Sequence, residues 1–408
     1  MINSVLSGKR IILGVTGSIA AYKACILASQ LTQAGAEVDV IMTESAMRFV
    51  TPLSFQALTG RPVYTSMWET DSGGGLGTHI AHVGLGHSAD LLIIAPATAH
   101  TLARLAHGLA DDLLSVTALA ARCPIILAPA MDVGMYEAPA TQANITVLRE
   151  RGVIFAGPGQ GRMASGLEGM GRLLEPEELL GICRVILGRS GPLAGKHLVV
   201  TAGPTREAID PVRFISNRSS GKQGFAIAQA ALDQGARVTL ISGPAALPTP
   251  VGAEYVRVTS AQEMHDAVLS YACGETPADA LIMSAAVADF RPVAVSEQKL
   301  KKEHNQAPQI ELARTPDILM AVSQNPSRPR LVIGFAAESE ELLRNAREKL
   351  ERKKLDLIVA NDITLPDAGF EVDTNRVALL STDAVEQYEL ASKEEVAARL
   401  ITWLTKRL

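Results

Sequence analysis

The sequence predicts two α/β domains, each built around a mainly parallel β-sheet. In both halves an apolar run that fits a buried strand leads into a helical segment and then a second apolar run, first over residues 11–42 and again over residues 197–242. Strand–helix–strand units of this kind form parallel sheets. The 408 residues are enough for two hydrophobic cores. Residues 188–192 read as a linker, so we expect the domains at 1–190 and 191–408.

In the first half, short apolar runs predict strands and amphipathic segments predict helices. The predicted strands are 11–15, 38–42, 91–95, 123–128 and 153–155, and the predicted helices are one that ends near Gly35, one near Ala46, and 52–58, 139–151 and 175–187. Two neighbouring strands end in small-residue turns, Pro96–Ala97–Thr98 and Pro129–Ala130–Met131. Such turns would lie on one rim of a parallel sheet and let a flat ligand approach the backbone.

The second half repeats this alternation and closes differently. The predicted strands are 197–200, 237–242, 255–258, 280–284, 331–335 and 357–360, and the predicted helices are 225–232, 261–271, 338–353 and 393–404. A further helix is expected to start with Thr315 as N-cap and Pro316 as its first residue. Residues 377–380 and 388–390 predict a short antiparallel pair.

Composition excludes several classes of function. The net charge of -5, the lack of a long basic run and an aromatic content of 4% argue against nucleic acid as a partner. The four cysteines form no CxxC pair, so neither a zinc site nor a disulfide framework is expected. No apolar run reaches membrane-spanning length. A cytoplasmic protein without a membrane partner is the expectation.

Gly17 and Ser18 follow the first predicted strand and precede the first helix. Ligands in parallel α/β folds bind beyond the carboxyl ends of strands, and helix N-termini favour anions. An anion site is therefore favoured over a purely structural tight turn.

Three histidines, His79, His82 and His87, lie close together after the Gly-rich stretch 72–77, which reads as a flexible loop or lid. No cysteine or carboxylate completes a metal site before Asp90, so no metal ligand is assigned. Pattern alone makes each a surface loop residue, although a histidine can carry a proton near neutral pH. The irregular, Gly-rich segment 157–171 suits a movable flap, and the alternative is a disordered loop.

The loop within residues 201–229 carries many polar side chains and reaches a helix entrance at Gly221 and Gly224. Its polar residues are Arg206, Asp210, Arg213, Asn217, Arg218, Ser219, Ser220 and Lys222. Serines, glycines and a lysine at a helix N-terminus suggest a phosphate site, with a solvated crossover loop as the alternative. The spacing matches neither of the common nucleotide motifs, so it does not identify the nucleotide.

These motifs together resemble the bifunctional enzymes of coenzyme A synthesis, in which phosphopantothenoylcysteine decarboxylase is fused to phosphopantothenate–cysteine ligase. The resemblance covers nearly the full length in the family's domain order. The sequences that carry it are GSIAAYK (17–23), APATA (95–99), PAM (129–131), TAGPTRE (201–207), DPVRFISNRSSGKQG (210–224), SAAVADF (284–290), KLKK (299–302), TPDI (315–318), GFAAE (334–338) and LDLIVAND (355–362).

For the first half, the resemblance implies a flavodoxin-like decarboxylase domain that binds FMN. It implies FMN contacts at Gly17, Ser18, Ile19, Thr43, Ser45, Pro96, Ala97 and Thr98. The family's catalytic histidine stands eight residues before the Asp of Ala-Asp-Leu, which is His82 here. The flavin would oxidise the cysteinyl thiol, allow CO2 to leave and return the hydride.

Two catalytic positions depart from the family pattern. The usual asparagine after Pro-Ala-Met is Asp132, and the usual cysteine of the flap is Ser165. An amide can donate to a substrate carboxylate, whereas an ionised aspartate repels it. A serine hydroxyl is a far weaker acid than the thiol that protonates the enethiolate in the usual form.

For the second half, the resemblance implies a ligase that activates 4'-phosphopantothenate with CTP as an acyl-cytidylate, with Mg2+, before cysteine displaces CMP. Asn217 matches the asparagine associated with that intermediate. The implied contacts to CTP are Ser284, Ala285, Asp289, Lys299, Pro316, Asp317, Ile318, Leu319, Phe335, Lys349 and Lys353. The turn 316–319 would act through its helix N-terminus. Lys349 and Lys353 stand four residues apart and would share one helix face.

The resemblance further implies a homo-oligomer, possibly a dodecamer, with flavin sites between subunits. Two alternatives remain: a ligase whose flavin domain is only an assembly scaffold, and a nicotinamide-dependent oxidoreductase. The second alternative is the weaker, because no GxGxxG follows a strand.

Overall fold

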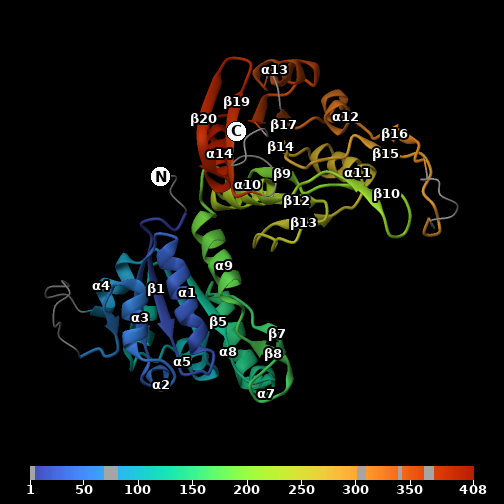
Figure 1. Ribbon diagram of the computed structural model, residues 1–408. Helices are drawn as coiled ribbons and strands as arrows, with labels where there is room; N and C mark the ends of the chain where they lie inside the picture. The colour runs from blue at the N-terminus through green and yellow to red at the C-terminus, as the bar shows by residue number, and fades with distance from the viewer. Residues whose placement is uncertain (1–4, 69–80, 301–308, 339–341, 363–371) are drawn as a thin grey trace. The chain divides into compact units, whose positions relative to one another are not determined.

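The computed structural model describes residues 5–68, 81–300, 309–338, 342–362 and 372–408, and the chain forms two compact units (Figure 1). The first ends at Leu187 and the second begins at Gly188. Among the described residues, no helix is both long and apolar enough to cross a membrane. Each unit has its own β-sheet and its own cores.

The first unit is a six-stranded sheet in the order β3-β2-β1-β4-β5-β6, and all of its pairings are parallel. The strands are β1 (Arg10–Val15), β2 (Glu37–Met42), β3 (Val63–Tyr64), β4 (Leu91–Ala97), β5 (Ile125–Pro129) and β6 (Ile154–Phe155). The helices are α1 (Ala21–Gln33), α2 (Glu44–Met47), α3 (Pro52–Thr59), α4 (Ala81–Ser88), α5 (Ala99–His107), α6 (Leu113–Ala120), α7 (Val133–Glu137), α8 (Pro139–Glu150) and α9 (Pro176–Gly188).

Helices cover both faces of this sheet, because successive strand side chains point to opposite sides. Ile11 and Leu13 of β1 pack into a core with α1, α3 and α9, whereas Ile12 packs into a second core with α4, α5, α6 and α8. The strand order reverses direction between β1 and β4, which is where open α/β sheets bind their ligands. The predicted parallel α/β fold is confirmed.

The segment predicted as an irregular flap contains an ordered hairpin, so that part of the prediction was wrong. Strands β7 (Gly159–Arg162) and β8 (Glu168–Arg172) pair antiparallel. Gly171 lies so close to the end of β5 that a Cβ atom there would be 2.3 Å from the Met131 carbonyl oxygen. The Met131 N–H donates to the Gly171 carbonyl at 3.0 Å, which fixes the hairpin base beside the strand rim.

The second unit is an eight-stranded sheet in the order β13-β12-β9-β14-β17-β18-β19-β20. Its strands are β9 (His197–Ala202), β12 (Arg237–Ser242), β13 (Glu254–Arg257), β14 (Ala280–Met283), β17 (Leu331–Glu338), β18 (Leu357–Asp362), β19 (Thr374–Leu380) and β20 (Val385–Ser392). Pairings from β13 to β18 are parallel, and β19 and β20 add the predicted antiparallel pair.

Helices again cover both faces. Helices α10 (Lys222–Asp233) and α14 (Lys393–Thr405) pack on one side, and α11 (Ala261–Ala272), α12 (Ile318–Gln324) and α13 (Leu342–Arg352) pack on the other. This arrangement places the entrance of α10 beyond the carboxyl end of β9, as expected for a doubly wound domain.

Three local predictions in this unit were incomplete or wrong. The loop after β9 contains a hairpin, β10 (Arg206–Ala208) with β11 (Phe214–Ser216), and a second hairpin pairs β15 (Phe290–Pro292) with β16 (Leu312–Arg314). The N-cap of α12 is Asp317, not Thr315, because the Asp317 carboxylate accepts from the Met320 N–H. The Thr315 hydroxyl instead donates to the Ala288 carbonyl at 2.6 Å.

Candidate active sites

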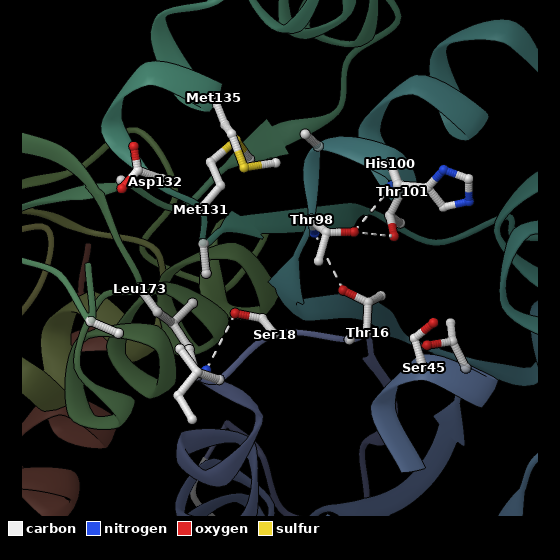
Figure 2. Close-up of a pocket in the computed structure, with 18 of the residues that line it drawn as sticks. Thr16, Ser18, Ser45, Thr98, His100, Thr101, Met131, Asp132, Met135 and Leu173 are labelled. Carbon is white, nitrogen blue, oxygen red and sulfur yellow. Dashed lines mark hydrogen bonds between the residues drawn. The ribbon is translucent and has the colours of Figure 1, made fainter. Parts of the chain in front are cut away.

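A cavity of about 1120 Å³ lies at the carboxyl ends of the strands of the first unit. Figure 2 shows its polar wall around Thr16, Ser18, Ser45 and Thr98. Of the predicted positions, the structure brings together Gly17, Ser18, Ile19, Thr43, Ser45, Thr98, Asp132 and Ser165. Residues far apart in sequence thus meet where the strand order reverses.

The floor beside Gly17 requires a glycine. A Cβ atom at Gly17 would be 2.4 Å from the Ser45 Cβ, so any other residue would push the two loops apart. Helix α1 behind it has neither a side-chain cap at Ala20 nor an acidic residue in its first turn. The Ala20 N–H donates to the Ser18 hydroxyl at 3.2 Å, and the Ala21 N–H donates to the Ser18 carbonyl at 2.9 Å. The positive end of the dipole of this 13-residue helix still suits a phosphate.

Pro96 and Ala97 are buried in β4 and do not line the cavity, contrary to the expected turn. The reason is that β4 continues to Ala97, which pairs with Pro129 of β5. The two residues support the wall instead. The Thr16 hydroxyl donates to the Pro96 carbonyl at 2.6 Å and accepts from the Thr98 N–H at 3.2 Å, so it ties the ends of β1 and β4 together (Figure 2).

Asp132 and Ser165 form a hydrogen-bonded pair at the cavity edge. The Ser165 hydroxyl donates to Asp132 Oδ2 at 2.6 Å, and Asp132 Oδ1 accepts from the Gly134 N–H at 3.1 Å as the N-cap of α7. In Figure 2, Asp132 lies on the side of the cavity with Met131 and Met135, away from Ser45. The pair links the tip of the β7–β8 hairpin to the turn after β5.

His82 is not brought to this cavity within one chain. It lies on α4, half-buried, and does not line the cavity. His79 and the stretch 72–77 lie outside the described residues. Within the part of the chain that the structure describes, no group of three His, Cys, Asp or Glu side chains could hold a metal ion.

A second cavity, of about 930 Å³, lies in the second unit at the entrance of α10. It is lined by most of the predicted positions: Asn217, Ser284, Ala285, Asp289, Pro316, Asp317, Ile318, Leu319, Phe335, Lys349 and Lys353. Lys299 is exposed and does not line it. The polar loop 201–229 therefore does contribute its Asn217-to-Gly224 part to a cavity.

Two threonine hydroxyls of β9 and the loop after it hold the wall of this cavity. Thr201 Oγ1 accepts from the Ala285 N–H at 3.1 Å, and Thr205 Oγ1 accepts from the Ala288 N–H at 3.0 Å. Both threonines are fully buried. The Asn217 amide donates to the Val287 carbonyl at 3.0 Å, so the loops after β9 and β14 run side by side.

Lys349 and Lys353 in this cavity are each held by a hydrogen bond or ion pair within the domain. Lys353 pairs with Asp317 at 2.9 Å, and Lys349 Nζ donates to the Phe335 carbonyl at 2.8 Å. Burial raises the pKa of Asp317, but the hydrogen bond from Lys353 and the Met320 N–H outweigh it, so the pKa of this carboxyl is lowered. The ionised Asp317 thus occupies the N-terminus of α12, through which the turn 316–319 was expected to contact CTP.

Several lining residues were missed in the sequence. Thr16, His100 and Arg104 line the first cavity, and Asn375 and Lys393 line the second. Asn375 and Lys393 come from the antiparallel end of the sheet and the start of α14, more than 150 residues after the Asn217-to-Gly224 part of the same cavity. Only the fold brings them there.

Two family models cover the chain in order. Residues 3–186 match the family described as Flavoprotein, and residues 193–408 match the DNA/pantothenate metabolism flavoprotein C-terminal domain. The chain is 47% identical over 401 residues to the Coenzyme A biosynthesis bifunctional protein CoaBC of Bacillus subtilis (strain 168), covering 97% of each. The chain belongs to the CoaBC family.

Other CoaBC proteins agree with this assignment. The protein from Mycobacterium tuberculosis (strain ATCC 25618 / H37Rv) is 47% identical over 409 residues, covering 96% of this chain and 95% of its own length. A crystal structure of the C-terminal domain of a CoaBC protein is 41% identical, covers 53% of this chain and 97% of its own, and has a TM-score of 0.45. Membership confirms the expected bifunctional enzyme of coenzyme A biosynthesis over the ligase-only alternative, and leaves no support for the nicotinamide enzyme.

Proposed function

We propose that the second domain joins cysteine to 4'-phosphopantothenate at the expense of CTP, and that the first domain decarboxylates the product to 4'-phosphopantetheine with FMN. The observation that carries this proposal is the convergence of the family's motif residues on one cavity in each domain. Both cavities lie at the carboxyl ends of parallel strands, where such folds bind ligands.

In the ligase cavity, the charges of Lys349 and Lys353 suit the phosphates of CTP. Their partners, the Phe335 carbonyl and Asp317, hold both ammonium groups at fixed positions before the nucleotide arrives. Asn217 lines this cavity and its amide donates to the Val287 carbonyl in the loop after β14. In the reaction, that amide would donate to the developing acyl-cytidylate. Mg2+ would arrive with CTP, because Mg2+ at nucleotide sites is held largely by phosphate oxygens and water.

In the decarboxylase cavity, the N-terminus of α1, which has no acidic residue in its first turn, and the adjacent Ser18 fit the phosphate of FMN. Thr43 and Ser45 line the wall where the ribityl chain would lie, and Thr98 lies beside the ring site. When bound, FMN supplies the electron acceptor that makes loss of CO2 possible. The protein's own residues bind and orient the substrate and hold protons, with Asp132 and Ser165 at the cavity edge.

His82 and Lys299 lie outside the two cavities of a single chain. We propose that the protein forms a homo-oligomer such as a dodecamer, in which these two side chains complete sites of other copies, with His82 of one copy serving the flavin of the next. The described cysteines are free thiols, which fits a reducing cytoplasmic location.

Two measurements test the proposed cofactor and nucleotide. The purified protein should carry a yellow cofactor whose mass after heat release is that of FMN. With 4'-phosphopantothenate present, pyrophosphate should be released from CTP faster than from ATP. A colourless protein that cannot be loaded with FMN would refute the proposed cofactor of the first domain. Pyrophosphate release that needs no phosphopantothenate would refute the proposed ligase reaction of the second.

A further inference from the structure

The turn between β10 and β11 holds a segment that is distant in sequence. Asp210 is a fully buried side chain in that turn. Its Oδ1 accepts from the N–H groups of Val212 and Arg213, each at 2.8 Å, and its Oδ2 accepts from the Leu300 N–H at 3.2 Å. One carboxylate therefore shapes its own turn with one oxygen and binds a backbone group 90 residues away with the other.

Arg213 binds the other backbone polar group of Leu300. Its guanidinium donates to the Leu300 carbonyl at 3.1 Å and lies 3.5 Å from Asp210 Oδ2. The two side chains thus take both backbone polar groups of Leu300. Nearby, the Ser296 N–H donates to the Ile209 carbonyl at 3.0 Å, which is a second tie between the same two segments.

The hydrogen bond from the Leu300 N–H to Asp210 is charge-assisted. Burial raises the pKa of Asp210, but the backbone donors Val212, Arg213 and Leu300, with the charge of Arg213, outweigh it and lower the pKa. The carboxylate is therefore ionised at neutral pH, and hydrogen bonds to an ionised acceptor are stronger than neutral ones.

Neither residue serves the cavity directly. Asp210 and Arg213 are not among the residues that line the ligase cavity, although they belong to the same polar loop as Asn217. Lys299, which immediately precedes Leu300, is exposed. A lysine side chain on an unfixed segment must lose both backbone and side-chain freedom when it binds a ligand. Because Asp210 and Arg213 already hold the backbone of Leu300, the backbone next to Lys299 loses less conformational entropy when the lysine binds a ligand.

We propose that Asp210 is a positioning residue for Lys299: it fixes the backbone of Leu300 and so places the Lys299 ammonium for CTP. The proposal rests on the contact between Lys299 and CTP proposed above. Asp210 and Arg213 together bind the N–H and the carbonyl of Leu300, and we call these two contacts the clamp. The competing explanation is that Asp210 only stabilises its own turn.

Asp210→Asn separates these explanations. The single amide oxygen can keep the bonds to Val212 and Arg213, whereas the amide nitrogen then faces the Leu300 N–H, donor against donor. The turn should survive and the clamp should be lost. Arg213→Gln removes the other half of the clamp. Asp383→Asn, an exposed carboxylate in the β19–β20 turn, is the matched control for the lost charge.

The experiment uses the full-length protein, with ligase rates measured against CTP concentration and amide hydrogen exchange measured over residues 293–300. In Asp210→Asn and Arg213→Gln, the KM for CTP should rise about tenfold, with a smaller change in kcat. Exchange should increase at Ser296 and Leu300 and stay unchanged in β9 and α10. Asp383→Asn should match the wild type in both measurements.

A double variant adds the decisive comparison. If Asp210 acts through Lys299, adding Asp210→Asn to Lys299→Ala should change the KM for CTP by less than about twofold. A raised KM in Lys299→Ala with a wild-type KM in Asp210→Asn would overturn the positioning role alone. An unchanged KM in Lys299→Ala would overturn both this proposal and the CTP contact on which it rests.

Discussion

At the scale of single residues, the Asp132–Ser165 pair stands at the two positions where the family resemblance leads us to expect an asparagine and a cysteine. The hydroxyl of Ser165 donates to Asp132, and both residues line the cavity. In the proposed site, a carboxylate at position 132 would repel the substrate carboxylate, while the Ser165 hydroxyl would give a proton or hold the hairpin tip in place. A hydrogen-bonded carboxylate and hydroxyl therefore stand where the resemblance implies an amide and a thiol.

Substitution of this pair should separate its two effects. Ser165→Ala should slow decarboxylation by about a hundredfold, the lower end for loss of a positioned proton donor, and Ser165→Cys should restore the rate. Asp132→Asn should lower the KM for phosphopantothenoylcysteine, because it removes the repulsion between two carboxylates. The rates are measured as CO2 release, with Glu137→Gln on the exposed side of α7 as control. A wild-type rate in Ser165→Ala would show that the proton comes from elsewhere.

His197 makes the stability of the second domain depend on pH. It is buried, its Nε2 lies 2.9 Å from the Thr239 hydroxyl, and its Nδ1 has no hydrogen-bond partner among the described residues. Thr239 donates to Glu254, so it accepts from the Nε2–H of a neutral ring. Burial, followed by the charge of Arg237, lowers the pKa of His197 below 6.5.

A lowered histidine pKa means that the folded state disfavours the charged ring. Its contribution to stability is complete above the unfolded pKa of 6.5 and is lost as the pH falls through the folded value. Between pH 7.5 and pH 5.5, the urea midpoint of the second domain should therefore fall more in the wild type than in His197→Gln. His87→Gln, an exposed histidine of the other domain, should leave this difference unchanged. Equal slopes for His197→Gln and the wild type would contradict the assignment.

At the scale of elements, the sequence predicted the strands of both main sheets except β3, but missed the hairpin strands and the helices α4, α5, α6 and α7. Buried apolar runs such as 91–95 and 280–284 fix strands because both faces of the sheets are covered. Strands of three residues, as in β11 and β16, give no alternating pattern, and Phe214 and Leu312 in them are about half exposed. Their pairing comes from loop contacts that no local pattern reveals.

The loops that build the ligase cavity depend on one very close backbone approach. A Cβ atom at Gly243 would lie 1.8 Å from the Pro204 carbonyl oxygen, and Pro204 bridges to Ala286 in the cavity wall. Because the obstacle is backbone, Gly243→Ala must displace this loop. It should cost about 1–3 kcal/mol of unfolding free energy, abolish most ligase activity and spare decarboxylation of supplied phosphopantothenoylcysteine.

Gly195→Ala is the control for this prediction. Gly195 has a φ of +79° but open space around its Cβ position, so alanine there should cost about 1–2 kcal/mol from backbone conformation alone and leave ligase activity intact. Equal ligase losses in Gly195→Ala and Gly243→Ala would show that general destabilisation, not the cavity wall, is responsible.

At the scale of the whole molecule, the sequence predicted two α/β domains, and most of the residues it assigned to the two sites line the two cavities, because strand-end motifs must converge in a doubly wound sheet. It could not predict that β4 runs on through Pro96 and Ala97, nor that Asn375 and Lys393 join the ligase cavity. It also could not show that His82 and Lys299 lie outside their cavities in one chain. These facts depend on where elements end and on contacts between distant segments.

The two units have separate cores, so each should fold alone. A chain of residues 191–408 should be colourless, give one cooperative thermal unfolding transition by circular dichroism and retain CTP-dependent ligation. A chain of residues 1–190 should bind FMN. An aggregated or unfolded 191–408 chain would show that the linker does not separate independent domains.

The most direct test of the central claim, that both halves work in one chain, is mass spectrometry of a single reaction. It contains the purified full-length protein, 4'-phosphopantothenate, cysteine, CTP and Mg2+. We predict 4'-phosphopantetheine and CO2, formed through phosphopantothenoylcysteine that does not accumulate. Accumulation of phosphopantothenoylcysteine without further product would mean that Asp132 and Ser165 do not support decarboxylation. Formation of neither product would contradict the ligase assignment itself.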